Sequence, residues 1–205
     1  MIRQTGKLIR RLLSGDGVRE DYAARAFILD ALPQHAVGAE IGVHEGEFSR
    51  LLLQRLSPSR LHLIDPWEYR PEPAYAESLY GGAKGRNQQW LDDRYRRTRQ
   101  RLRKSLDREQ VVIHRLRSAN AVSLFPSHYF DWIYVDGDHQ FDAVEADLRD
   151  YLRRVKPGGW IAGGGFRQGA WWGDGVVRAV NEFVVRTQHQ QFVTHADQFL
   201  LRLAG

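Results

Sequence analysis

Residues 36–46 read Ala-Val-Gly-Ala-Glu-Ile-Gly-Val-His-Glu-Gly, and the organisation of the chain follows from them. The apolar run Val37–Val43 predicts a short buried strand, and Gly42 and Gly46 predict a tight turn. A helix, Glu47–Leu56, is expected next, with its apolar residues on one face. This order brings free backbone N–H groups close to a nucleotide-like ligand, because glycine has no Cβ to hold the ligand away.

Glu40 lies inside this strand and turn and narrows the class of ligand. The pattern Glu40-x-Gly42-x-x-x-Gly46 lacks the full Gly-x-Gly-x-x-Gly that suits a pyrophosphate, and a carboxylate here would repel an anion. It suits a cation, such as the α-amino group of an amino-acid-like cofactor, and S-adenosylmethionine has that group. The alternative at this point is a glycine bend that only joins a strand to a helix.

A second acid follows about twenty residues later. Arg60–Asp65 predicts a strand that ends in Asp65. In nucleoside-binding α/β folds an acid at this strand end binds both ribose hydroxyls, and the spacing from the glycine turn fits that role. The alternative is that Asp65 only opens a turn before Pro66.

The composition is that of a folded chain without cysteine. Its 205 residues are 42% hydrophobic, enough for a single α/β domain over 1–205 with a sizeable core. The lack of cysteine excludes disulfides and thiolate metal sites and fits a cytoplasmic location. We see no apolar run of membrane-spanning length and no signal-peptide core.

The net charge of +5 is concentrated in one predicted helix, Gln88–Leu106. The basic residues are Arg94, Arg96, Arg97, Arg99, Arg101, Arg103 and Lys104. Acids precede them, as a helix dipole prefers, so a solvated helix face is the favoured reading. The alternative is a nucleic-acid-binding patch, which the near absence of interleaved aromatic residues argues against.

Two segments lie outside the regular alternation of strands and helices. Residues 1–35 predict a helical extension, with an amphipathic helix at Ile2–Leu13 and a second at Arg19–Leu32. The first helix could contact a membrane surface, the domain itself or a second subunit in a homodimer. The long insertion 66–90 leaves the ligand edge of the sheet and predicts a lid or acceptor-binding segment, with a disordered surface loop as the alternative.

The second half of the chain supplies the remaining elements. Strands are expected at Val111–Arg117, Tyr129–Val135, Trp160–Ala162, 191–194 and Phe199–Leu203, and helices at Ala121–Phe125, Phe141–Val155 and Gly175–Thr187, with a turn at 156–159. The last two strands fit an antiparallel pair. Polar residues follow the strand ends, at Ser118-Ala-Asn120 and at Asp136-Gly-Asp-His139.

Four motifs in this order resemble class I S-adenosylmethionine-dependent methyltransferases, and most closely the O-methyltransferase branch called methyltransferase family 24. They are Glu40-Ile-Gly-Val-His-Glu-Gly46, Leu63-Ile-Asp65-Pro-Trp67, Tyr134-Val-Asp136-Gly-Asp-His139 and Lys156-Pro-Gly-Gly159. The resemblance covers about 36–183. It implies a Rossmann-like α/β fold with a seven-stranded sheet of order 3-2-1-4-5-7-6, flanked by helices.

The resemblance also implies roles for single residues. Those expected to bind the cofactor are Glu40, Gly42, Val43, His44, Gly46, Asp65, Pro66, Ser118, Ala119 and Asp136. Glu40 and the glycines would line the methionine part, Asp65 would bind the ribose, and Ser118 with Ala119 would border the adenine. Asp136 would lie beneath the sulfonium.

His139 is the expected general base, because its ordinary pKa lies near 6.5 and it follows the same strand end as Asp136. The alternative is a structural histidine bonded to Asp136 or Asp138. Metal-dependent relatives carry acids at the end of the fifth strand, whereas this chain has Gly163-Gly-Gly165. Asp136, Asp138 and Asp174 therefore form a thin set of ligands for Mg²⁺.

We therefore expect methylation of a small-molecule or sugar hydroxyl. Three alternatives stay open at this point. They are a nucleic-acid methyltransferase, a cofactor-binding protein without turnover, which the three glycines would favour, and a nicotinamide-dependent oxidoreductase, which Glu40 argues against.

Overall fold

The computed structural model describes residues 16–82 and 86–205, with the side chains of 16–23 left out. The amphipathic helix predicted at Ile2–Leu13 lies outside the described residues. None of the described helices is both long and apolar enough to cross a bilayer.

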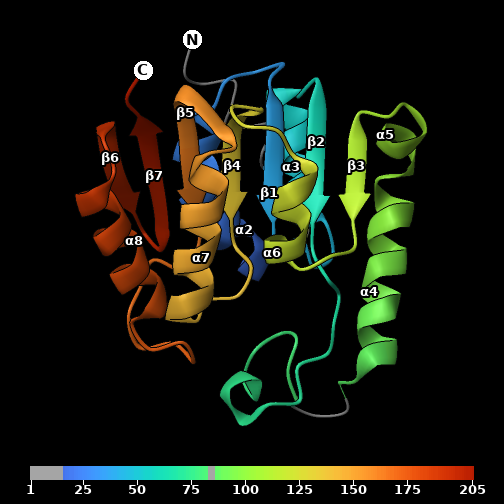
Figure 1. Ribbon diagram of the computed structural model, residues 1–205. Helices are drawn as coiled ribbons and strands as arrows, with labels where there is room; N and C mark the ends of the chain where they lie inside the picture. Colours follow the sequence, from blue (N-terminus) through green and yellow to red (C-terminus); the bar gives the residue numbers. More distant parts are fainter. Residues whose placement is uncertain (1–15, 83–85) are drawn as a thin grey trace.

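A seven-stranded sheet forms the centre of the fold (Figure 1). Its strands are β1 (Val37–Ile41), β2 (Arg60–Ile64), β3 (Val111–His114), β4 (Phe130–Val135), β5 (Val155–Gly163), β6 (His189–His195) and β7 (Gln198–Leu203). Their order is 3-2-1-4-5-7-6, as predicted. β1 to β5 pair in parallel, and β7 is antiparallel to both β5 and β6. The carboxyl ends of the five parallel strands therefore share one edge, which faces down in Figure 1.

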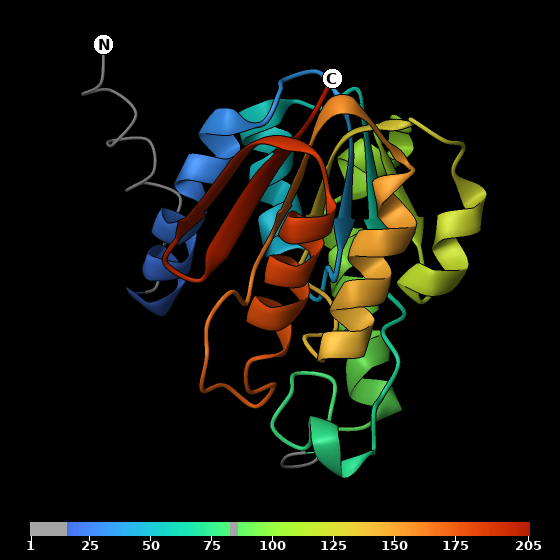
Figure 2. The same cartoon turned by 60° about the vertical axis from the view of Figure 1, so that its left-hand side comes forward.

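Helices cover both faces of the sheet (Figures 1 and 2). The first layer contains α2 (Asp16–Ala31), α3 (Glu47–Leu56) and α4 (Gln88–Arg101), and the second contains α6 (Ser118–Ala121), α7 (Phe141–Leu152) and α8 (Gly175–Arg186). Short elements complete the chain: α5 (Arg103–Asp107), η1 (Pro73–Tyr75) and η2 (Val122–Leu124). Because strands covered on both sides must be apolar on both faces, β4 alternates its side chains between two separate buried clusters.

β1 and β4 pack closely at Gly38. A Cβ at Gly38 of β1 would lie 2.1 Å from the ring of Trp132 on β4, which is fully buried. Glycine at this position therefore lets the largest side chain of β4 pack directly against β1.

Several predicted boundaries are corrected. β1 and β2 end at Ile41 and Ile64. The backbone N–H groups of Val43 and His44, which follow β1, bond the Asp65 side chain, so β1 does not reach the predicted Val43. The predicted helix Gln88–Leu106 breaks at Leu102, where φ is −101°, and α5 then turns toward β3.

The predicted turn at 156–159 is wrong, since β5 runs through it. The register against β4 shifts between Phe130 and Trp132. A Cβ at Gly159 would lie 2.9 Å from the Asp131 carbonyl oxygen, so glycine allows the strand to bulge there and continue.

Candidate functional site

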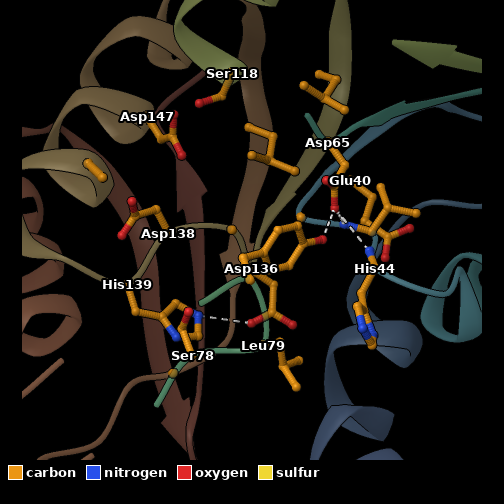
Figure 3. A pocket seen from close by; sticks show the side chains of 18 of the residues that line it. Glu40, His44, Asp65, Ser78, Leu79, Ser118, Asp136, Asp138, His139 and Asp147 are labelled. Atoms are coloured by element: carbon orange, nitrogen blue, oxygen red, sulfur yellow. Dashed lines mark hydrogen bonds and ion pairs between the residues drawn. The ribbon is translucent and has the colours of Figure 1, made fainter. Parts of the chain in front are cut away.

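A cavity of about 680 Å³ opens at the carboxyl ends of β1, β2 and β4 (Figure 3). This is the edge at which open parallel sheets bind ligands. Of the predicted site residues, the cavity is lined by Glu40, Gly42, Val43, His44, Asp65, Pro66, Ser118, Ala119, Asp136 and His139. Gly46 does not line it.

Glu40 is a buried acid at this edge. It lies on β1, is 2% exposed and accepts a hydrogen bond from the Ser49 hydroxyl of α3. Burial raises the pKa of Glu40 to about 8, and the Ser49 hydrogen bond and the Arg25 guanidinium offset only part of that rise. Glu40 is therefore mostly protonated at pH 7, and a cation beside it would favour its ionised form.

Asp65, directly after β2, is bonded through both carboxylate oxygens. Oδ2 accepts hydrogen bonds from the backbone N–H groups of Val43 at 2.8 Å and His44 at 3.0 Å, and from the Tyr80 hydroxyl. Oδ1 accepts one from the Trp67 N–H at 2.7 Å. Since each oxygen has about two lone pairs, Oδ2 is fully used and Oδ1 has room for one more donor.

The two glycines of the first turn have different tasks. Gly42 has φ +86°, and a Cβ there would lie 2.2 Å from the Asp136 carbonyl oxygen, so only glycine lets the turn pass this close to the end of β4. Gly46 has φ +70°, and a Cβ there would meet Thr98 and Leu102 near the end of α4. Gly46 thus shapes the start of α3 and its contact with α4.

Asp136 and His139 form a pair after β4. His139 Nε2 lies 3.3 Å from Asp136 Oδ1, and the Arg25 guanidinium of α2 lies 2.8 Å from Oδ2. Burial acts to raise the pKa of Asp136, but Arg25 and His139 outweigh it, so this pKa lies below its ordinary value. The ionised Asp136 orients the imidazole, which packs edge-on against Trp172 at 4.4 Å between ring centres.

Two loops meet over the cavity. Tyr75, in the 66–82 segment, donates a hydrogen bond of 2.6 Å to Asp138 and contacts Trp171 from the loop before α8 at 5.6 Å. Arg70 lies over the Tyr75 ring at 3.9 Å and also reaches Asp138. The segment is thus held against the strand ends by both polar and aromatic contacts.

Sequence reasoning missed several of these residues. Arg25, Tyr80 and Asp147 all line the cavity. Tyr80 lies in the segment predicted as a lid, but its partner could not be foreseen. Arg25 and Asp147 look like ordinary polar positions of amphipathic helices, and no local signal separates them from surface residues.

The family model of the methyltransferase domain, methyltransferase family 24, matches residues 39–164, which is more than half of the chain. The chain belongs to this methyltransferase family. The match runs from β1 to the end of β5 and includes Glu40, Asp65, Asp136 and His139. The resemblance to class I S-adenosylmethionine-dependent methyltransferases is thereby confirmed.

Solved structures share the fold of this methyltransferase at low sequence identity. A proposed rRNA methylase from Clostridium thermocellum is 12% identical over 95% of this chain and 100% of its own, with a TM-score of 0.59. A proposed caffeoyl-CoA O-methyltransferase from Staphylococcus aureus is 13% identical over 98% and 90%, with a TM-score of 0.58. A proposed methyltransferase from Streptococcus mutans, solved in complex with S-adenosylhomocysteine, is 12% identical over 93% and 99%, with a TM-score of 0.56. No curated protein matches the sequence significantly.

The described acids of this methyltransferase have partners other than a metal ion. Asp138 is engaged by Tyr75 and Arg70, and Asp174 faces Arg178 at the start of α8, away from the cavity lining. Among the residues that the structure describes, no three His, Cys, Asp or Glu side chains are grouped to hold a metal ion. The donor set does not fit Mg²⁺, which needs several oxygen ligands.

The glycine run that replaces the expected acids packs against the Asp136–His139 pair. A Cβ at Gly164 would lie 2.4 Å from Asp136 Oδ1, and one at Gly165, where φ is +73°, would lie 3.1 Å from the His139 ring. At Gly163 it would lie 2.3 Å from the Val135 carbonyl oxygen. An acid cannot fit here without displacing Asp136 or His139, so the glycines preserve the pair.

Proposed function

We propose that this methyltransferase transfers the methyl group of S-adenosylmethionine to a hydroxyl group of a small molecule or sugar. The observation that supports the proposal is one shared cavity. Glu40 and Asp65, two buried acids suited to the cofactor, open into the same space as the Asp136–His139 pair.

The chain's residues fit the parts of the cofactor. Glu40 would bind the α-ammonium group and Arg25 the carboxylate of the methionine part, because both line one side of the cavity with opposite charges available. One ribose hydroxyl would bind Asp65 Oδ1, which has room for a donor, and the other would take the place of Tyr80 on Oδ2. Ser118 and Ala119 would border the adenine.

His139 would remove the acceptor proton. Bound S-adenosylmethionine supplies an electrophilic methyl group, so the protein's task is to align the acceptor oxygen and take its proton. Asp136 favours the imidazole tautomer with a proton on Nε2, which leaves Nδ1 to accept a proton. Trp172 holds the ring in place.

A small acceptor is favoured over nucleic acid by the charges on α4. Four arginines, three on α4 and one on α5, form ion pairs with acids of this chain. The pairs are Arg94 with Glu45, Arg96 with Asp93, Arg101 with Glu45 and Glu47, and Arg103 with Asp107. The paired arginines leave less free charge for a phosphate backbone. The two loops over the cavity also favour an acceptor that fits beneath them.

The test is isothermal titration with S-adenosylhomocysteine and with adenosine, which lacks the amino-acid part. We expect the wild type to bind S-adenosylhomocysteine. Asp65→Ala should make the binding free energy of both ligands less favourable by roughly 1–3 kcal/mol, the contribution of hydrogen bonds to a charged group. Arg25→Met should lower the affinity for S-adenosylhomocysteine and leave the affinity for adenosine nearly unchanged. NAD binding without S-adenosylhomocysteine binding would overturn the proposal.

A further inference from the structure

We propose that Asp147 recognises the 6-amino group of the cofactor's adenine, and so selects adenosyl over other purine cofactors. The inference rests on the proposed function and adds a specificity-determining residue to it. It follows from the shape of one end of the cavity, from the donors around Asp147 and from the charges on α7.

Small side chains line the cavity beside Ser118 and Asp147. Ser118 and Ala119 form one wall, and Ala143, Ala146 and Asp147 line it from a single face of α7. The two alanines leave room that longer side chains would fill. Figure 3 shows the Ser118 and Asp147 side chains pointing toward each other, at the opposite end of the view from the Asp136–His139 pair.

The Asp147 carboxyl has unused acceptor capacity. A carboxylate offers about four lone-pair sites. Among the residues that the structure describes, Ser118 is the side chain whose hydrogen bond lowers the pKa of this carboxyl. An amino group on a ligand between these walls would find an acceptor there.

Asp147 differs from the other acids of α7. Glu145 and Asp150 pair with Arg149 on the outer side, whereas Asp147 is 5% exposed and has no ion pair within the described chain. Burial raises the pKa of Asp147 to about 7, and the Ser118 hydroxyl offsets only part of that rise. A buried carboxyl without a cation destabilises a fold, and a ligand N–H donor would offset this cost.

The test compares S-adenosylhomocysteine with S-inosylhomocysteine, which has a carbonyl oxygen in place of the 6-amino group. Both are titrated at pH 8 into the wild type, Asp147→Asn and Asp150→Asn. Asparagine keeps the shape of the side chain and can donate as well as accept. Asp150→Asn removes the same charge from α7 outside the cavity lining, and thermal melting confirms that each variant is folded.

We expect the wild type and Asp150→Asn to prefer S-adenosylhomocysteine by roughly 10- to 100-fold, the effect of a hydrogen bond to a charged group. In Asp147→Asn the preference should narrow to within about threefold. An unchanged preference in Asp147→Asn, with S-adenosylhomocysteine still bound, would overturn this inference and leave the proposed function standing. Failure of the wild type to bind either ligand would overturn both.

Discussion

Glu40 and Asp136 lie in the same cavity but are held in opposite protonation states. Glu40 is buried and Asp136 is partly buried, and desolvation alone would raise both pKa values. Asp136 has the Arg25 guanidinium at 2.8 Å, which keeps it ionised, whereas the direct partner of Glu40 among the described residues is the neutral Ser49 hydroxyl. The pocket thus contains one carboxylate ready to orient His139 and one carboxyl that a ligand cation would ionise.

We predict that binding of S-adenosylhomocysteine releases a proton from Glu40 below pH 8. The ligand ammonium favours the ionised carboxylate, whose pKa in the free protein is about 8. Affinity should therefore rise with pH, by up to about tenfold per unit below pH 8. Titration in buffers of different ionisation enthalpy measures the number of protons released on binding. Glu40→Gln should abolish the proton release that is assigned to Glu40. Equal proton release in that variant would assign the proton to another group.

We predict that His139→Ala lowers turnover by roughly 10²–10⁴-fold, the range for loss of a general base. Affinity for S-adenosylhomocysteine should stay nearly intact, since His139 is assigned to the acceptor and not to the cofactor. Activity should also survive a chelator, because the described residues do not form a magnesium site. A fully active variant would make His139 structural, and loss of activity with chelator that magnesium restores would contradict the metal-independent route.

Among the elements, the segment 66–82 lies over the cavity at the strand ends. Its chain is held to the strand ends through Tyr75 and Arg70 on Asp138 and through Tyr80 on Asp65. Its role as a lid or acceptor-binding segment stays a prediction, and its contacts indicate what a ligand would have to displace first. Because Asp65 Oδ2 already accepts three hydrogen bonds, the proposed ribose hydroxyls would compete with Tyr80 for this oxygen.

We predict that Tyr80→Phe binds S-adenosylhomocysteine roughly tenfold more tightly than the wild type, because no hydroxyl then competes for Asp65. Tyr69→Phe is the matched control, since Tyr69 lies in the same segment and outside the cavity lining. Hydrogen exchange should show whether the segment loses or gains protection when the ligand binds. Weaker binding by Tyr80→Phe would mean that the hydroxyl contacts the ligand.

At the scale of the molecule, the cavity joins both helical layers of the fold. Arg25 comes from α2 on one face of the sheet, and Asp147 comes from α7 on the other. The turns after β1, β2 and β4 lie between them. A ligand in this space contacts both halves of the core at once, so its binding energy should stabilise the whole fold.

We predict that S-adenosylhomocysteine at about 100 times its dissociation constant raises the melting temperature by roughly 5–10 °C. A ligand at that excess adds about 2.7 kcal/mol, and each kcal/mol shifts a domain of this size by roughly 2–4 °C. Differential scanning calorimetry gives the shift, with Asp65→Ala as the control at the same ligand concentration. A melting temperature that does not change when the ligand is added would contradict binding in this cavity.

Local pattern was sufficient to find most strands and the edge of the sheet at which the cavity lies. Val37–Val43 and Arg60–Asp65 could be recognised as strands because burial on both faces demands continuous apolar runs. The placement of Glu40, Asp65, Asp136 and His139 at one edge then follows, because parallel strands end on the same side. Strand order came from the family resemblance and not from any of these patterns.

Contacts between residues that are far apart in the sequence could not be predicted from it. Arg25 lies 111 positions from Asp136, and Tyr80 reaches Asp65 only because the 66–82 segment folds back over the strand ends. The glycine run at Gly163–Gly165, which suggested a lost site, proved to be the space that Asp136 and His139 occupy. Periodicity and spacing report what each residue does within its own helix or strand. Contacts between distant elements, and the pKa values that burial sets, arise only when the core closes around them.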